Sequence, residues 1–130
     1  MPDVLLLDYA QTTRRTTSLA LEKAGFNVIS AETIEIGLAA LQRSLPAAVL
    51  VNTDIPGMNA QAVCEVIHRA HAGRMFPIFV VTPPLERGIP DWSNVIPNCF
   101  FLEKPISTEM MVARLAETLA TQTASAGSSR

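Results

Sequence analysis

Hydrophobic residues in this chain form short unbroken runs that alternate with longer segments in which apolar residues recur every three or four positions. A short unbroken run is typical of a strand buried on both faces, whereas the wider spacing is typical of an amphipathic helix. The predicted strands are Val4–Leu7, Phe26–Ala31, Ala47–Val51, Pro77–Val81 and Cys99–Leu102. Strands that alternate with helices predict an α/β fold, with an open parallel sheet covered by helices on both faces.

The segments between the strands differ in how strongly they favour a helix. The region from Gln11 to the stop at Gly25 is rich in β-branched Thr, which weakens its helix propensity. The later helical segments start at residues whose side chains can cap a helix, and these residues are Thr33, Asn59 and Ser107. We therefore expect helices after the first, second, third and fifth strands.

The segment between the fourth and fifth strands does not read as an ordinary helix. It contains one glycine and four prolines, namely Pro83, Pro84, Gly88, Pro90 and Pro97. A proline inside a helix costs about 3 kcal/mol, because it removes a hydrogen bond and clashes with the preceding turn. We expect a short turn over Leu85–Arg87, an irregular remainder, and a fourth helix that is short or irregular. Trp92 lies in this segment and is a candidate interface residue, with packing against the core as the alternative.

Length and composition limit the number of domains and the classes of function. The chain has 130 residues, 48% of them hydrophobic and 17% charged, so it is too apolar to be disordered. We expect one domain over residues 1–120 and a flexible tail or linker over residues 121–130, which are rich in Ala, Ser and Thr. The net charge of −2 argues against nucleic-acid binding.

Sequence features also predict the cellular compartment of the protein. No apolar run approaches the ~18 residues of a membrane span, and the start of the chain lacks the features of a secretory signal. Cys64 and Cys99 lack metal-site spacing and fit buried thiols in a reducing compartment. We therefore expect a cytoplasmic protein that does not enter the membrane.

The candidate site lies where the strands end. In open parallel sheets the working site lies beyond the carboxyl ends of the strands. Asp8, Asn52 and Thr82 come directly after apolar runs, and Lys104 follows the last one. These four residues are expected to form one polar cluster.

These motifs, in this order, resemble the receiver domain of two-component response regulators, over about residues 3–120. The resemblance rests on Leu6–Asp8, Val51–Met58, Val80–Thr82 and Phe101–Pro105. It implies a CheY-like, flavodoxin-like fold with strand order 2-1-3-4-5, and a role in phosphorelay signal transduction. By resemblance, Thr82 and Phe101 occupy the switch positions, and the Lys104–Pro105 bond is often cis.

The phosphorylation pocket of this receiver-like sequence departs from the family pattern. By resemblance, two acidic residues follow the first strand, but here Asp8 is followed by Tyr9. The phosphoacceptor position, four residues before the Pro-Gly, holds Asn52 instead of aspartate. An amide is a poor nucleophile, and Mg²⁺ prefers anionic oxygen ligands. We therefore expect a pseudo-receiver that is not phosphorylated at Asn52, with at most weak Mg²⁺ binding at Asp8, Asn52 and Asp54.

The sequence leaves several interpretations of the residues in this pocket open. Asp8 is expected to pair with Lys104. Asp54 is either an alternative phosphoacceptor or a solvated residue of the turn. Thr82 can bond a backbone group instead of a phosphoryl group. Phe101 lacks the hydroxyl of a Tyr and is expected to point inward.

The leading functional prediction is a signalling module that acts by protein–protein contact. Its expected partner is a histidine kinase, an effector or another regulator, and its oligomeric state is not predicted. The alternatives are a phosphorylatable receiver that uses Asp54 with Mg²⁺, and a sensor of a small ligand or anion near Lys104. An enzyme is not expected, because no residue set supplies a nucleophile, a base and an electrophile.

Overall fold

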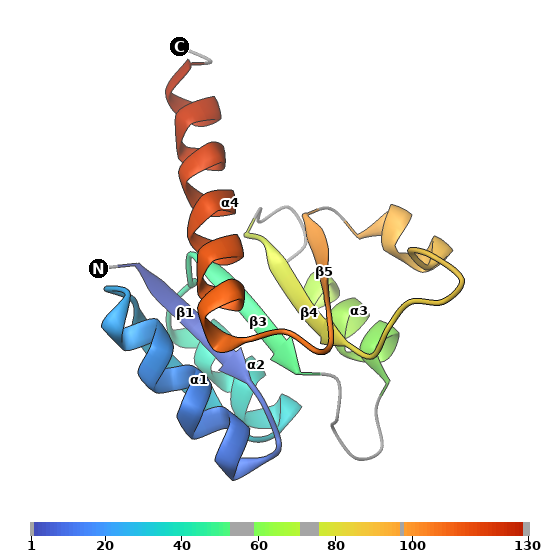
Figure 1. Ribbon diagram of the computed structural model, residues 1–130, viewed down its shortest axis with the longest axis horizontal. Helices are drawn as coiled ribbons and strands as arrows, with labels where there is room; N and C mark the ends of the chain where they lie inside the picture. The colour runs from blue at the N-terminus through green and yellow to red at the C-terminus, as the bar shows by residue number, and fades with distance from the viewer. Residues whose placement is uncertain (1, 53–58, 71–75, 97, 129–130) are drawn as a thin grey trace.

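A computed structural model of the protein describes residues 2–52, 59–70, 76–96 and 98–128, with residues 123–128 described by their backbone (Figure 1). The elements in chain order are β1 (Asp3–Leu7), α1 (Gln11–Lys23), β2 (Asn27–Ala31), α2 (Ile34–Arg43), β3 (Ala48–Asn52), α3 (Ala60–Ala70), β4 (Ile78–Thr82), the 3-10 helix η1 (Asp91–Val95), β5 (Cys99–Glu103) and α4 (Thr108–Ser128). The five strands are parallel and lie in the order β2-β1-β3-β4-β5. Both the predicted fold class and the predicted strand order are confirmed.

Alternate residues of the central strands contribute side chains to two separate hydrophobic cores, one on each face of the sheet. Leu5 and Leu7 of β1 belong to a core shared with α2, α3 and η1, which we call the α2/α3 face. Val4 and Leu6 belong to the core shared with α1 and α4, which we call the α1/α4 face. All four side chains are almost completely buried, because the sheet is covered on both sides. The continuous apolar runs in the sequence follow from this burial.

Side-chain caps begin three of the helices, at the residues that the sequence predicts. The Thr33 hydroxyl accepts a hydrogen bond from the Ile36 amide at 3.2 Å at the start of α2. Asn59 and Ser107 cap α3 and α4 in the same way, at 2.8 and 3.1 Å. Helix α1 starts after Ala10, which supplies no side-chain cap. It ends before Gly25, whose φ of +96° suits a glycine.

The residues described between β4 and β5, 83–96 and 98, form no α-helix, as the prolines of this segment predict. A turn forms at the expected place, where the Gly88 amide donates to the Leu85 carbonyl at 3.0 Å. The expected irregular remainder is wrong in one detail, because Asp91–Val95 forms η1. Pro90 precedes this 3-10 helix, where its fixed φ and missing N–H are tolerated. The helix in this segment is therefore short, in agreement with the short or irregular fourth helix that the sequence predicts.

Helix α4 extends further than the sequence suggests. It continues to Ser128, through residues 121–128 that we expected to belong to a flexible tail, and it projects beyond the sheet in Figure 1. Once a helix is anchored in the core, each further residue adds one hydrogen bond at little cost. The Gln122 side chain also donates to Asn98 Oδ1 at 3.2 Å. The expected domain boundary at residue 120 therefore falls within a helix. No helix in the described ranges is long and apolar enough to span a membrane.

Candidate functional site

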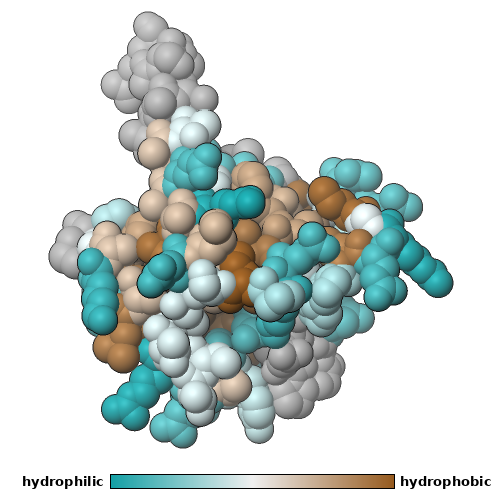
Figure 2. Space-filling model, in the orientation of Figure 1, coloured by the Kyte–Doolittle hydropathy of each residue, from teal (hydrophilic) through white to brown (hydrophobic). Residues whose placement is uncertain are grey.

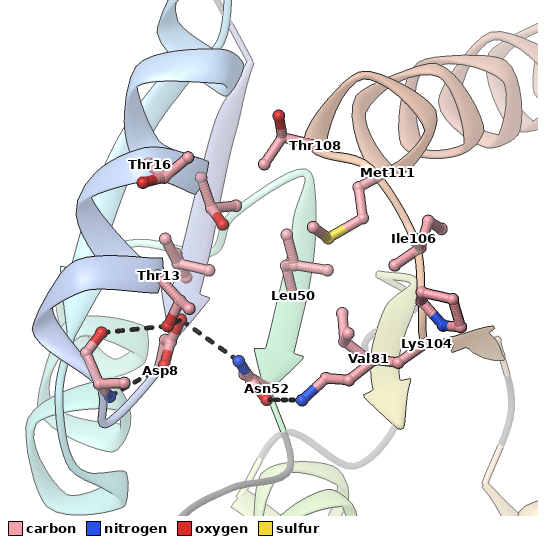
Figure 3. A pocket seen from close by; sticks show the side chains of 14 residues that line it. Asp8, Thr13, Thr16, Leu50, Asn52, Val81, Lys104, Ile106, Thr108 and Met111 are labelled. Atoms are coloured by element: carbon pink, nitrogen blue, oxygen red, sulfur yellow. Dashed lines mark hydrogen bonds between the residues drawn. The ribbon is translucent and has the colours of Figure 1, made fainter. Parts of the chain in front are cut away.

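Three of the four residues predicted to form a polar cluster, Asp8, Asn52 and Lys104, are linked by hydrogen bonds at the carboxyl edge of the sheet (Figure 3). Asp8 follows β1, and Asn52 is the last residue of β3. Lys104 follows β5 and reaches across β4 toward Asn52. Parallel strands bring their carboxyl ends to the same edge, so residues far apart in the sequence meet there.

Asp8 is a buried carboxylate whose two oxygens accept hydrogen bonds from its own chain neighbourhood. Only 2% of its surface is exposed. The Ala10 amide donates to Oδ1 at 3.0 Å, and the Thr13 hydroxyl donates to Oδ2 at 2.7 Å. Arg14 donates to the backbone carbonyl of Asp8 at 2.9 Å. These contacts compensate for burial of the carboxylate and tie it to the first turn of α1.

Asn52 stands between Asp8 and Lys104 and contacts both of them. Its Nδ2 donates to Asp8 Oδ2 at 3.5 Å, a long hydrogen bond. Its Oδ1 accepts a hydrogen bond from Lys104 Nζ at 3.2 Å. An amide can donate on one side and accept on the other, whereas a carboxylate at this position would repel Asp8. The expected association of Asp8 with Lys104 is thus found in part, because it runs through Asn52.

The second residue of the expected acidic pair lies outside this network. The Tyr9 side chain is 52% exposed, and its backbone carbonyl accepts a hydrogen bond from Arg14 at 3.1 Å. Asp54 falls outside the described residues.

In the described cluster, Asp8 is the carboxylate beside Asn52, and its oxygens already accept three hydrogen bonds. Mg²⁺ prefers several anionic oxygens, and this cluster supplies one such group next to an ammonium. No group of three metal-binding side chains occurs within the described part of the chain.

The two switch positions lie on neighbouring strands. Thr82 is buried, and its carbonyl accepts a hydrogen bond from the Lys104 amide at 2.7 Å. Its hydroxyl forms no hydrogen bond to any residue that the structure describes. Phe101 is half-buried against the α2/α3 core, in agreement with the inward orientation expected for it. The peptide bond between Lys104 and Pro105 is cis.

Trp92 packs onto the switch position from η1. Its ring meets that of Phe101 edge to face, with centroids 5.6 Å apart and planes at 73°. Both rings are half-buried and contact the α2/α3 core. Trp92 therefore has the packing role considered for it, and its role as an interface residue stays a prediction.

Two features of the structure are absent from the sequence-based predictions. The first is a cavity of about 550 Å³ beside Asp8 and Asn52, between α1 and α4. The available signal was the series of short Thr side chains on α1, of which Thr13, Thr16 and Thr17 line the cavity. Their weak helix propensity was evident, but their small volume at a helix–helix junction was not.

The second feature is a contact between the two cysteines. Cys64 on α3 and Cys99 on β5 are both free thiols, and each shifts the pKa of the other. Hydrogen bonding toward Cys99 and then burial raise the pKa of Cys64 far above its usual range. Hydrogen bonding toward Cys64 lowers the pKa of Cys99, against the opposing effect of burial.

Comparisons with known proteins agree with this architecture. No family model matches the chain. The protein PilH from Pseudomonas aeruginosa is 24% identical over 120 residues, which cover 92% of this chain and 99% of PilH.

Among solved structures, the chemotaxis protein CheY4 of Vibrio cholerae aligns with a TM-score of 0.80 at 20% identity, over 90% of this chain and 98% of CheY4. A CheY-like receiver domain protein from Methanospirillum hungatei aligns with a TM-score of 0.80 at 23% identity, over 96% of this chain and 98% of that protein. The chain therefore has the fold of the CheY-like response-regulator receiver domains.

Proposed function

We propose that this chain is a receiver-type signalling module that works without phosphorylation of residue 52. The observation that carries the proposal is the position of Asn52, whose amide links buried Asp8 to Lys104. Phosphoryl transfer to a receiver requires an ionised carboxylate as nucleophile and a cation to neutralise the transferred charge. An amide supplies no such nucleophile, and one carboxylate beside a lysine is a weak site for Mg²⁺.

In this proposal the module transmits its signal by contact with another protein and catalyses no reaction. Its partner is a histidine kinase, an effector or another regulator, and it acts in the cytoplasm. The sequence similarity to PilH and the fold shared with CheY4 support a place in two-component or chemotaxis-type signalling. Asn52 then has a structural role, because it keeps Asp8 and Lys104 together with no need for a bound metal or phosphoryl group.

The test uses beryllofluoride, which imitates a phosphoryl group on an aspartate, together with Mg²⁺. We expect amide NMR signals of Asp8, Asn52, Thr82 and Lys104 in the native chain to stay unchanged during the titration. The double variant Tyr9→Asp with Asn52→Asp restores the two missing acids and should gain saturable, Mg²⁺-dependent shifts at these positions. Asn94→Asp makes the same chemical change on exposed η1, and this control should respond like the native chain.

Two results of this titration would contradict the proposal. Saturable shifts in the native chain that disappear in Asp54→Ala would contradict the proposal and support a receiver that uses a displaced acceptor. Saturable shifts that persist in Asp54→Ala would also contradict it, because another group would then accept the phosphoryl analogue.

A further inference from the structure

The cavity between α1 and α4 lies directly beside the polar cluster, on the α1/α4 face of the sheet (Figure 3). Its volume of about 550 Å³ is within the range of about 300–1,000 Å³ that is typical of small-molecule sites. In Figure 2 hydrophobic atoms lie in the middle of this face, between α4 and the paler surface of α1. Its described lining combines aliphatic residues of the strands, threonines of α1 and the Asp8–Asn52–Lys104 cluster.

The cavity exists because α1 carries short side chains at its junction with α4. Its floor is formed by aliphatic residues of three neighbouring strands, Leu6, Leu50 and Val81. Met111 and Leu115 fill the space under α4, but α1 presents threonines toward it for two turns before Leu21. A Thr side chain reaches less far than Leu, so the gap between the helices stays open above an apolar floor.

The charges around the cavity restrict what it can hold. Among the described lining residues, Asp8 and Lys104 are the charged ones, and they are opposite in sign. Asn52 joins them through its amide, so they form one compensated group at the end of the cavity. An anion placed there would meet the Asp8 carboxylate, and a cation would meet the Lys104 ammonium.

From this lining we propose that the cavity binds an uncharged, largely apolar organic molecule. The aliphatic floor would hold the body of the molecule, by burial of apolar surface. A hydroxyl or carbonyl group would face the Asp8–Asn52–Lys104 cluster, and the threonine hydroxyls can donate or accept further hydrogen bonds. This inference goes beyond the proposed function: the two share the Asp8–Asn52–Lys104 cluster, but the body of the ligand would lie in the space between α1 and α4, and its test does not measure phosphorylation at residue 52.

The experiment uses Nile red, an uncharged, largely apolar dye that carries a carbonyl group and whose emission shifts to the blue in apolar sites. We expect saturable binding with one dye per chain. Thr16→Phe places a ring into the cavity from an exposed position and should weaken binding by about tenfold or more. Thr12→Phe adds the same ring one turn earlier on α1, outside the cavity lining, and should stay within about twofold of the native affinity.

A second variant protects the test against a folding defect in the first. Thr17→Leu fills the cavity from a position that is 6% exposed and should also weaken binding of the dye. Circular dichroism melting curves verify that each variant is folded. Loss of blue-shifted binding in both Thr16→Phe and Thr17→Leu supports the proposal. Binding that is not saturable, or that neither variant weakens, places the dye elsewhere and overturns it.

Three competitors with the same aromatic ring test the charge argument. Benzyl alcohol is neutral, benzoate is an anion, and benzylamine is a cation at neutral pH. We expect benzyl alcohol to displace Nile red at a lower concentration than either charged analogue. Displacement that is strongest with benzoate would make this an anion site near Lys104, and strongest displacement by benzylamine would make it a cation site at Asp8. Either result would overturn the proposal of a neutral ligand.

Discussion

The two faces of the sheet are built from alternate residues of the same strands, yet their covers differ. On the α2/α3 face, Val63, Cys64 and Ile67 of α3 are all buried against the strands. On the α1/α4 face, threonines of α1 leave a cavity of about 550 Å³ above Leu50. Because the strands are similarly apolar toward both sides, the helices determine how completely each face is filled. The same receiver fold can therefore combine one closely packed face with one that has room for a ligand.

The largest expected effect compares the same substitution on the two faces. Leu5→Ala removes a side chain that is 1% exposed on the α2/α3 face, and Leu50→Ala removes one that is 2% exposed beside the cavity. Buried Leu→Ala substitutions cost about 2–5 kcal/mol, and the cost grows with the new void. We expect about 4 kcal/mol for Leu5→Ala but about 2–3 kcal/mol for Leu50→Ala, because part of the space around Leu50 is already open.

Urea unfolding of the two Leu variants measures this difference directly. The slope of the transition should be the same for both, so that the change in midpoint reports stability alone. Equal losses, or a larger loss for Leu50→Ala, would mean that the two faces are equally well packed.

The second prediction concerns the packing of the 3-10 helix η1 against the α2/α3 face. Trp92→Ala removes the ring that meets Phe101 edge to face and should lower the free energy of unfolding by about 2 kcal/mol. Val95→Ala is the control on the same 3-10 helix: Val95 is 72% exposed, and its loss should stay within about 0.5 kcal/mol. A Trp92→Ala variant as stable as native would leave the interface as the remaining role for Trp92.

Sequence reasoning predicted the strands well because their physical signal is local. A run such as Val49–Val51 is buried on both faces, so its pattern does not depend on what lies above it. Asn52 and Lys104 were found for a related reason, since they follow such runs at one edge of the sheet. A short or irregular helix was expected between the fourth and fifth strands, but its position at Asp91–Val95 was not predicted, because it depends on packing of Trp92 against a distant strand.

The cavity and the link through Asn52 could not be predicted from local pattern. Both depend on distances between elements that are far apart in the sequence, such as Thr17 on α1 and Met111 on α4. The sequence suggested direct pairing of Asp8 with Lys104 because opposite charges attract. It did not indicate that the amide of Asn52 lies between them.

The third prediction adds volume to the more open face. Thr17→Leu on α1 extends an apolar side chain over the cavity and should stabilise the protein by about 1 kcal/mol. Thr12→Leu is the matched control, because it brings the same gain in helix propensity at an exposed position. The difference between the two variants in thermal melting isolates the packing contribution. A Thr17→Leu variant less stable than Thr12→Leu would indicate that the space near Thr17 is already filled.

The smallest expected effect concerns the thiols of the closely packed face, and it is read from alkylation rates as a function of pH. Cys64 has a raised pKa and is completely buried, so it should react with iodoacetamide only when the protein unfolds. Hydrogen bonding toward Cys64 lowers the pKa of Cys99, so its thiolate forms at a lower pH than that of an ordinary cysteine. Cys64→Ala removes this interaction while burial still opposes the charge, and the midpoint of Cys99 alkylation should therefore move to higher pH. An unchanged midpoint would mean that the two thiols do not interact. Rapid labelling of Cys64 in the native chain would mean that the α2/α3 face opens to solvent as readily as the α1/α4 face.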